Sequence, residues 1–387
     1  MERDTFKGFV RPDGSVGIRN RVAVIPTVSC ANGVAANISK AVPGTVPFLH
    51  GHGCGRAIEV SMHTRALTGL GLNPNVAAAI VVGLGCETVQ AGAVAAGIAE
   101  TGKPCRHLVI QEQGGSRKTT EAGIRIARDF VEDAETEVRR ACSLESIVLG
   151  LECGGSDAFS GVTANPVVGL VSDWLVNSGG RVILTENTEM IGTAHILSRR
   201  SKSPEVAARV EQLVSRAHKR TKDILGEFAT YVIAPGNMDG GLSSIREKSL
   251  GCIVKGGSTP VCEVVDYGQA PKEKGLTIMD APGYDTESMA GLAAAGCQII
   301  IFTTGRGTPV GFPAVPVIKV ASTSRLYTLM EDDMDIDAGV VLEGESLDEV
   351  AGRIRALALR VMCGEPTKAE MNGQEGILCL AAMTPAF

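Results

Sequence analysis

The sequence contains few aromatic residues, little excess charge and no long apolar run. One Trp, four Tyr and nine Phe among 387 residues are too few for a platform that stacks single-stranded nucleic acid. The formal net charge of −6 argues against a nucleic-acid binder held by counterion release. No apolar stretch reaches the roughly 20 residues that span a bilayer, and the mixed-charge N-terminus has no apolar signal-peptide core. We therefore expect a soluble, cytoplasmic protein.

Several short motifs are also missing. The absence of G-x-x-x-x-G-K-[ST] disfavours nucleotide hydrolysis. The absence of G-x-G-x-x-G after the first predicted strand disfavours a nicotinamide cofactor. None of the 11 cysteines forms a C-x-x-C pair, so neither a zinc ribbon nor a thioredoxin-like dithiol is expected. Without a secretion signal, these cysteines are predicted to be free thiols, metal ligands or nucleophiles.

Glycine and apolar residues are abundant. The 47 glycines and the hydrophobic fraction of 44% predict a large core with many tight turns. At roughly 150 residues per domain, the length predicts two or three domains.

Apolar runs alternate with helical patterns along the chain. The runs predict strands at 22–27, 76–83, 105–111, 146–151, 180–185, 276–280, 298–303 and 316–321. The patterns between them predict helices at 33–42, 119–141, 165–178, 204–226 and 347–363. Such alternation indicates parallel sheets covered on both faces. We predict an α/β fold with two doubly wound, mostly parallel-sheet (Rossmann-like) domains, comprising residues 1–144 and 145–387.

Polar turns are expected at the ligand-binding edges of these sheets. Open α/β sheets bind ligands beyond the carboxyl ends of their strands, where helix N-termini suit carboxylate, sulfonate or phosphate groups. Five polar turns fall at such positions: residues 29–32, 50–55, 85–88, 152–157 and 303–308.

Four cysteines in these turns are candidate metal ligands: Cys30, Cys54, Cys86 and Cys153. Thiolate and imidazole suit zinc or ferrous iron, and His52, beside Cys54, is a candidate catalytic residue. The alternative is that the cysteines are small buried hydrophobes and that the glycines around His52 only build a turn. The other cysteines, Cys252 among them, are predicted to be structural.

Candidate substrate-binding residues carry positive charge or exposed amide groups. Arg306 follows a buried strand, and its planar guanidinium would hold a carboxylate in bidentate fashion; the alternative is a surface arginine. The turn of residues 154–156 resembles an anion-binding nest. Arg19 and Asn20 either belong to the site or hold a turn. The full set of substrate-binding candidates is Arg19, Asn20, Gly154, Gly155, Ser156, Asp157 and Arg306.

Two further residues are candidates for proton transfer. Glu189 lies at the predicted start of a helix, where acidic residues also serve simply as dipole partners. Lys248 is a candidate base if it is buried, whereas a solvated lysine is the alternative.

The turns taken together resemble a known family. The strings are GFVRPDGSVGIRNRVAVIPTVSCAN, HGHGCG, NPNVAAAIVVGLGCE, IQEQGG, CGGSDAFSGVTANPVVG, EKSLGC, DAPGYD and FTTGRGTPVG. In this order they resemble the large catalytic region of the altronate and galactarate dehydratases, a family that includes the large subunit of (2R)-sulfolactate sulfo-lyase. Family members often carry a small N-terminal β-rich domain. Because this chain opens near the catalytic region, it is similar to the arrangement in which that domain is a separate subunit.

The resemblance implies β-elimination from a 2-hydroxy acid to give a 2-oxo acid. It also implies a divalent metal, Fe²⁺, and a hetero-oligomer with the small subunit. We favour (2R)-sulfolactate sulfo-lyase, which would release sulfite and pyruvate; the alternative is an altronate or galactarate dehydratase. Two readings from other classes remain open: a non-catalytic scaffold or ligand-binding subunit, and a hydrolase with Cys54 as nucleophile and His52 as base.

Overall fold

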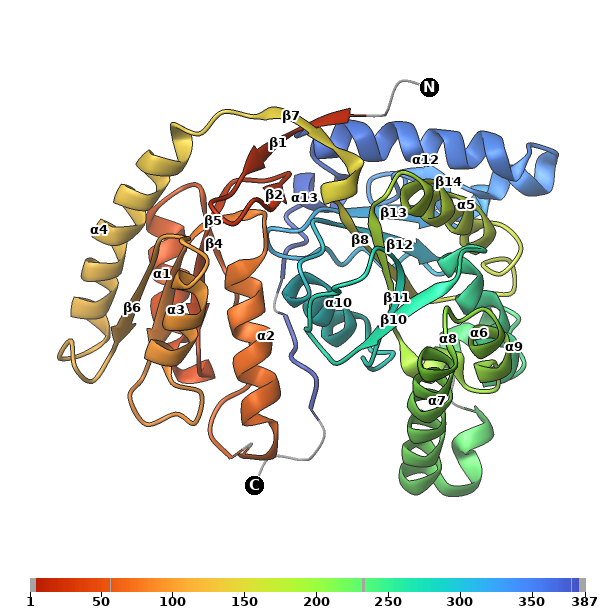
Figure 1. The fold of residues 1–387 in the computed structure, drawn as a ribbon, viewed down its shortest axis with the longest axis horizontal. Coiled ribbons are helices and arrows are strands. Elements are labelled where there is room, and N and C mark those ends of the chain that lie inside the picture. The colour runs from red at the N-terminus through yellow and green to blue at the C-terminus, as the bar shows by residue number, and fades with distance from the viewer. Residues whose placement is uncertain (1–4, 56, 232–233, 377, 383–387) are drawn as a thin grey trace.

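A computed structural model describes residues 5–55, 57–231, 234–376 and 378–382. The chain forms two lobes, each built around a parallel sheet (Figure 1). The predicted α/β fold with doubly wound parallel sheets is confirmed. Among the described residues, no helix is long and apolar enough to cross a membrane.

The smaller lobe contains four parallel strands in the order β4-β3-β5-β6. They are β3 (Arg21–Pro26), β4 (Thr45–Pro47), β5 (Val76–Gly83) and β6 (Cys105–Val109). Every residue of β5 is buried, as its unbroken apolar run predicts. One face of the sheet packs on α1 (Asn32–Ala41) and α4 (Ser116–Glu135). The other face packs on α2 (Val60–Leu72) and α3 (Ala91–Ala99).

The larger lobe contains seven parallel strands in the order β10-β11-β9-β8-β12-β13-β14. They are β8 (Val148–Gly154), β9 (Arg181–Leu184), β10 (Val261–Val265), β11 (Gly275–Met279), β12 (Ile299–Thr304), β13 (Val317–Ala321) and β14 (Ile336–Asp337). Helices α5 (Ala164–Asn177) and α12 (Leu347–Met362) cover one face. Helix α10 (Asp285–Ala294) covers the face toward the smaller lobe.

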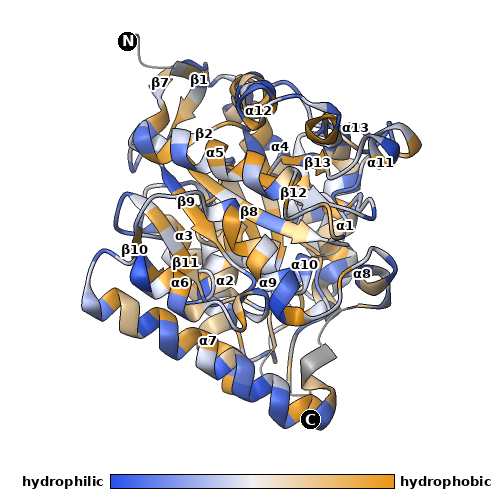
Figure 2. Ribbon diagram, turned by 90° about the vertical axis from the view of Figure 1, so that its right-hand side faces the viewer, coloured by the Kyte–Doolittle hydropathy of each residue, from blue (hydrophilic) through white to orange (hydrophobic). Residues whose placement is uncertain are grey.

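Further helices belong to the larger lobe. They are α6 (Ala194–Arg199), α7 (Pro204–Leu225), α8 (Pro235–Asp239), α9 (Ile245–Cys252), α11 (Ser324–Leu329) and α13 (Lys368–Met371). Helix α7 begins where the hydroxyl of Ser203 accepts from Val206 N, with Pro204 in the first turn. Apolar and charged residues alternate along this helix (Figure 2). Val210, Leu213, Val214 and Ala217 are buried, whereas Ile224 and Leu225 at its end are exposed.

A small antiparallel sheet was not predicted from the sequence. It contains β1 (Thr5–Val10), β2 (Val16–Gly17) and β7 (Arg140–Ser143), in the order β2-β1-β7. The helix expected at 119–141 was predicted too long, because α4 ends at Glu135. Residues 140–143 instead pair with 5–8 of the N-terminal strand. This long-range pairing overrides the helical pattern of the local sequence.

The two lobes pack directly on each other through α2 and α10. A side chain on Gly69 of α2 would place its Cβ 2.3 Å from the carbonyl oxygen of Ala294, so glycine permits this close approach. The C-terminal segment adds a second link, because Leu380 N donates to Nε2 of His52 at 3.1 Å.

In each parallel sheet, two neighbouring strands lead into connections that run toward opposite edges of the sheet. In the larger sheet these strands are β8 and β12; in the smaller sheet they are β3 and β5. Ligands of such sheets bind in the crevice beyond the carboxyl ends of these strands. The fold therefore offers two binding positions, one on each lobe.

Candidate functional site

A cavity of about 580 Å³ lies beyond the carboxyl ends of β8 and β12. It brings together several residues that the sequence singled out far apart. Its lining residues are Gly154, Gly155, Thr188, Glu189, Leu225, Ala234, Gly236, Asn237, Ile245, Lys248, Gly283, Tyr284, Asp285 and Arg306. A second cavity of about 280 Å³, lined in part by Ser156, Asp157, Lys248 and Cys252, shares Lys248 with the first.

Two thiols and one carboxylate meet beside the larger of these cavities. The thiols of Cys153 and Cys252 donate to the same oxygen of Glu189, at 2.9 and 2.8 Å. Their sulfur atoms are 3.4 Å apart. Cys153 lies near the end of β8, Glu189 lies in the 3-10 turn Asn187–Met190, and Cys252 ends α9. Among the described residues, only this group places three potential metal-ligand atoms within 4.8 Å of one another.

Two lysines neutralise the carboxylates around this group. Lys248 forms an ion pair with Glu189. Lys255, in the 3-10 turn Ile253–Gly256, donates to Glu186 at 2.6 Å, and both side chains are fully buried. The amide of Cys153 donates to the same oxygen of Glu186 at 3.0 Å. These pairings satisfy charges that would otherwise be costly to bury.

Glu186 adopts a left-handed backbone conformation, with φ of 67°. This region is unfavourable for a residue with a side chain and costs of order 1–3 kcal/mol. Asn187, the next residue, is held by a backbone hydrogen bond to Ala281 O and by a side-chain bond to Asp280, at 2.8 and 2.6 Å. The strained conformation directs the carboxylate of Glu186 back to Cys153 and Lys255.

The ion pair between Lys248 and Glu189 fixes the charge of both groups. Burial alone would raise the pKa of Glu189, but the ammonium groups of Lys248 and Lys255 lower it below its usual value. Burial would lower the pKa of Lys248, but the charge of Glu189 raises it above its usual value. Lys248 is therefore a charged acid in this arrangement, whereas the sequence suggested it as a base.

Asp285 lies at the floor of the cavity, as the first residue of α10. Burial and the charge of Glu189 raise the pKa of Asp285 to about 6. A side chain on Gly154 would place its Cβ 2.1 Å from the carboxylate of Asp285, so the glycine leaves room for that group. A carboxylate that titrates near neutrality is suited to general base catalysis.

A further lysine lies behind Asp285, inside the sheet. Glu152, Phe302 and Lys319 are directly paired neighbours on β8, β12 and β13. Nζ of Lys319 lies 3.5 Å from the centre of the Phe302 ring, and no described residue accepts a hydrogen bond from it. Burial lowers the pKa of Lys319 to about 7, although Asp285 and Glu152 oppose the shift.

The thiol–carboxylate group fits a divalent metal ion. Two cysteines and a carboxylate supply three ligands, which leaves a position open for substrate, as in catalytic metal sites. Burial raises the pKa of Cys153, so its thiol stays protonated unless a cation replaces the proton.

The other predicted thiols lie on the smaller lobe. Cys30, Cys54 and Cys86 are all exposed at the carboxyl edge of the four-stranded sheet. They do not join Cys153 in a single donor group. His52 also lies there, where its ring packs 5.0 Å from that of His63 and its Nε2 accepts from Leu380 N. The functional roles proposed for these four residues stay predictions.

Arg19 and Asn20 lie at the opposite, amino edge of the smaller sheet. Arg19 forms a two-point ion pair with Glu370, at 2.7 and 2.8 Å, and donates to Val361 O. Asn20 donates to Ala134 O at 2.7 Å. The structure thus separates both residues from the cavity, because they immediately precede β3 rather than follow it. Their placement matches the alternative considered from the sequence, in which they hold a turn.

Asp157 is held by hydrogen bonds from neighbouring serines. Its carboxylate accepts from Ser160 N and Oγ and from Ser322 Oγ, at 2.7–2.9 Å. These contacts hold the 154–157 turn against the end of β13. Gly155 has φ of 57°, a conformation that lets successive amides converge on an anion.

Five residues of the site were not identified from the sequence. They are Glu186, Cys252, Lys255, Asp285 and Lys319. Cys252 was predicted to be structural, but it lies in the donor group with Cys153. Asp285 lies within one of the quoted motifs, DAPGYD, which was the available signal. Lys255 and Lys319 carry no local signal, because their burial depends on distant strands and helices.

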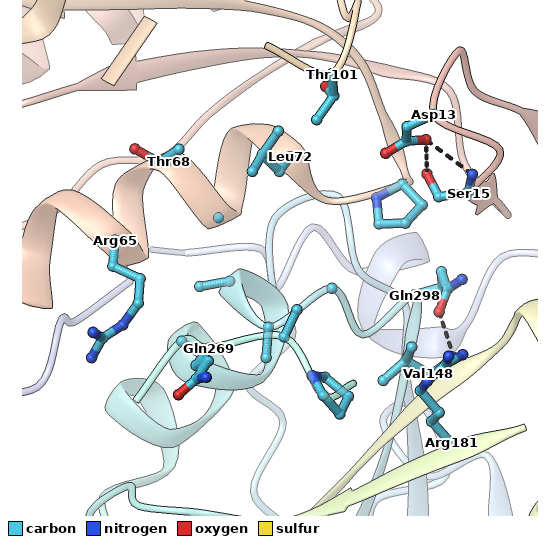
Figure 3. Close-up of a pocket in the computed structure, with 18 of the residues that line it drawn as sticks. Asp13, Ser15, Arg65, Thr68, Leu72, Thr101, Val148, Arg181, Gln269 and Gln298 are labelled. Carbon is cyan, nitrogen blue, oxygen red and sulfur yellow. Dashed lines mark hydrogen bonds between the residues drawn. The ribbon is translucent and has the colours of Figure 1, made fainter. Parts of the chain in front are cut away.

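Figure 3 shows a different cavity, of about 980 Å³, between the lobes. It is lined by Arg65, Thr68 and Leu72 of α2 and by Val148 and Arg181 at the amino ends of β8 and β9. Its larger volume does not make it the better site, because ligands of parallel sheets bind at the carboxyl ends. The titratable groups described above, Glu189, Lys248 and Asp285, line the cavity of about 580 Å³ instead.

Fold and site together define an α/β enzyme with an acid–base cavity beside a thiol–carboxylate group. Residues 144–384 match the D-galactarate/altronate dehydratase C-terminal domain, and residues 8–135 match the second domain of D-galactarate dehydratase/altronate hydrolase. The chain therefore belongs to the D-galactarate/altronate dehydratase family and is a lyase.

Three relatives illustrate the range of this family. The chain is 36% identical to altronate dehydratase of Bacillus subtilis over 369 residues, which cover 90% of this chain and 71% of the relative. It is 35% identical to (2R)-sulfolactate sulfo-lyase subunit beta of Chromohalobacter salexigens, over 95% of both chains. It is 34% identical to galactarate dehydratase (L-threo-forming) of Escherichia coli, over 100% of this chain and 78% of the relative.

Proposed function

We propose that this chain is the large catalytic subunit of a metal-dependent lyase that β-eliminates from a 2-hydroxy acid. The observation that carries the proposal is the shared cavity at the ends of β8 and β12. There a cationic anchor, a charged acid and a carboxylate of raised pKa line one space: Arg306, Lys248 and Asp285. Elimination needs these three capabilities, which are anion binding, proton donation and proton removal.

Arg306 is the proposed anchor for the acidic group of the substrate. It is exposed at the cavity, and no ion pair or hydrogen bond holds its guanidinium among the described residues. The amides of Gly154 and Gly155 provide a second set of donors. Together they would orient the substrate with its C2 hydrogen toward the floor of the cavity.

Asp285 is the proposed base and Lys248 the proposed acid. Asp285 would take the C2 proton, and the ammonium of Lys248 would give a proton to a departing hydroxide or balance the charge of a departing sulfite. A divalent ion held by Cys153, Glu189 and Cys252, Fe²⁺ in our proposal, would stabilise the negative charge that develops on the enolate.

Among substrates, we favour (2R)-sulfolactate, with altronate or galactarate as the alternative. The relative named as the sulfo-lyase subunit aligns with this chain over 95% of both lengths, and its name as subunit beta supports a separate small partner. Altronate dehydratases at 36% and 33% identity support the alternative.

The test is a product assay under anaerobic conditions. The chain would be mixed with Fe²⁺ and its small β-rich partner and offered each acid separately. Release of sulfite and pyruvate from sulfolactate supports the proposal. Water loss from altronate or galactarate alone would move the assignment to the alternative. Failure with all three acids would leave a scaffold or ligand-binding subunit as the better explanation.

A further inference from the structure

The smaller lobe carries three exposed thiols at its own ligand-binding edge. Cys30 follows β3, Cys54 follows β4 and Cys86 follows β5. Strands β3 and β5 are the neighbours whose connections diverge, so Cys30 and Cys86 flank the crevice where such a sheet binds ligands. Free cysteines are usually buried, and three exposed ones at a single sheet edge require an explanation.

The three loops contact one another. Sγ of Cys54 lies 3.8 Å from the carbonyl oxygen of Cys86. Ser29 N, next to Cys30, donates to His52 O at 2.7 Å. A Cβ on Gly53 would lie 2.7 Å from the side chain of Val28, so the loop before Cys54 packs tightly on the loop before Cys30.

Two buried polar side chains, His50 and Glu87, fix the backbone of these loops through hydrogen bonds. His50 bonds through Nε2 to Pro26 O at 2.7 Å, and its Nδ1 accepts from His52 N at 3.2 Å. Burial lowers the pKa of His50 to about 4, so the ring is neutral and makes both bonds. Glu87 accepts from Gly85 N at 2.6 Å and from Thr27 Oγ1 at 3.0 Å. The three thiols are exposed, on loops whose backbone these hydrogen bonds fix.

We infer that Cys30, Cys54 and Cys86 bind an iron–sulfur cluster of the [4Fe–4S] class. The three ligand atoms do not form a group within 4.8 Å of one another, so the thiols are not arranged around one ion such as Zn²⁺. In a cubane cluster each thiolate binds a different iron, which requires ligands spaced more widely. Three thiolates leave one iron without a protein thiolate, and the exposed position of the loops leaves that iron open to solvent.

This site is distinct from the donor group of Cys153, which lies on the other lobe and is buried. The inference is also independent of the substrate proposed above, because it concerns the cofactor content of the protein alone. Assembly needs ferrous iron and sulfide as co-reactants, and the cysteines lose their thiol protons as they bind iron.

The test is reconstitution of the purified chain under anaerobic conditions with Fe²⁺, sulfide and a thiol reductant, followed by desalting. We expect about four iron and four acid-labile sulfide per chain, with the broad visible absorbance of such clusters. The variants Cys30→Ser, Cys54→Ser and Cys86→Ser should each lose most of the sulfide and absorbance. Because the three side chains are exposed, thermal unfolding of the variants before reconstitution should match that of the unsubstituted chain.

Matched controls separate this site from the rest of the chain. Cys142→Ser and Cys262→Ser, at partly buried positions outside the three loops, should keep the cluster, as should Cys153→Ser. Iron retained without sulfide, preferential binding of Zn²⁺, or equal loss of sulfide in the control variants would overturn the inference. Elimination activity does not enter this test, so a wrong substrate assignment would leave the result unaffected.

Discussion

The thiol of Cys252 donates to the carboxylate of Glu189 at 2.8 Å, although 63 residues separate them in the sequence. Together with Cys153, these two residues form the proposed metal site on the larger lobe. Glu189→Gln should remove one tightly held divalent ion per chain, because the amide lacks the charge that offsets the ion. Elemental analysis after dialysis against a weak chelator would measure the loss.

The control for this metal prediction is Cys297→Ser, which substitutes a buried thiol outside the group. It should retain the ion. The sulfide content should stay unchanged in Glu189→Gln, because the proposed cluster lies on the other lobe. Full metal retention in both Glu189→Gln and Cys252→Ser would contradict the assignment of these ligands.

Lys248 and Lys255 should respond differently to substitution by methionine. Lys255→Met leaves Glu186 buried without its partner, and breaking such a pair costs about 3–5 kcal/mol of folding stability. Lys248 lines the cavity, so Lys248→Met should lower kcat strongly and change the free energy of unfolding less. Urea unfolding and steady-state kinetics on both variants provide the comparison. If both variants lost kcat equally and kept their stability, Lys255 would not have the purely stabilising role that separates it from Lys248.

Lys319 should give the protein a stability that increases with pH. Burial lowers its pKa from 10.5 to about 7, so the folded state binds this proton less tightly than the unfolded state. The stability lost to this group is therefore recovered as pH rises from about 7 toward 10.5, by roughly 1.4 kcal/mol per pH unit.

The test compares the pH dependence of unfolding in Lys319→Met and the unsubstituted chain. The variant should be more stable near pH 7 and should lose part of the alkaline rise. Lys103, whose pKa burial also lowers to about 7, contributes the same sign in both proteins and cancels in the difference. An identical pH slope in the two proteins would show that Lys319 remains charged in the fold.

Substitution of Arg306 should affect KM, whereas substitution of Arg19 should affect folding stability. Arg306→Met removes the proposed anchor, and the loss of a charge-assisted contact of about 1.5–3 kcal/mol should raise KM about 10- to 100-fold. Arg19→Met breaks a buried ion pair with Glu370 and should instead lower stability, with KM unchanged. A normal KM in Arg306→Met would remove this residue from the site.

Much of the fold follows from local sequence. The apolar run at 76–83 is the strand that the structure contains, and the amphipathic pattern at 204–226 ends within one residue of α7. The antiparallel sheet was missed because β7 forms only where 140–143 meets the N-terminal strand. Such pairing depends on contacts that no local window contains.

Most of the sequence candidates that line the cavity follow strands; Lys248, on α9, is an exception. The sequence nominated Gly154, Gly155 and Arg306 because turns after strands of a parallel sheet share one edge, and all three line the cavity. Arg19 was a site candidate because its charge is visible in the sequence; the structure pairs it with Glu370, which is 351 residues away and which no local pattern indicates. Lys319 was missed because its neighbours Glu152 and Phe302 come from two other strands.

The small antiparallel sheet restricts motion of the two lobes against each other. Strand β7 lies just before β8, where the chain passes between lobes, and β1 pairs with it along residues 5–8. The Arg19–Glu370 pair links the same region to the C-terminal part of the chain. A hinge motion of one lobe against the other would have to break this ladder and expose the core shared by α2 and α10. Entry and release should therefore depend on small displacements of α8 and α9 at the rim, and turnover should be insensitive to cross-links that join the lobes.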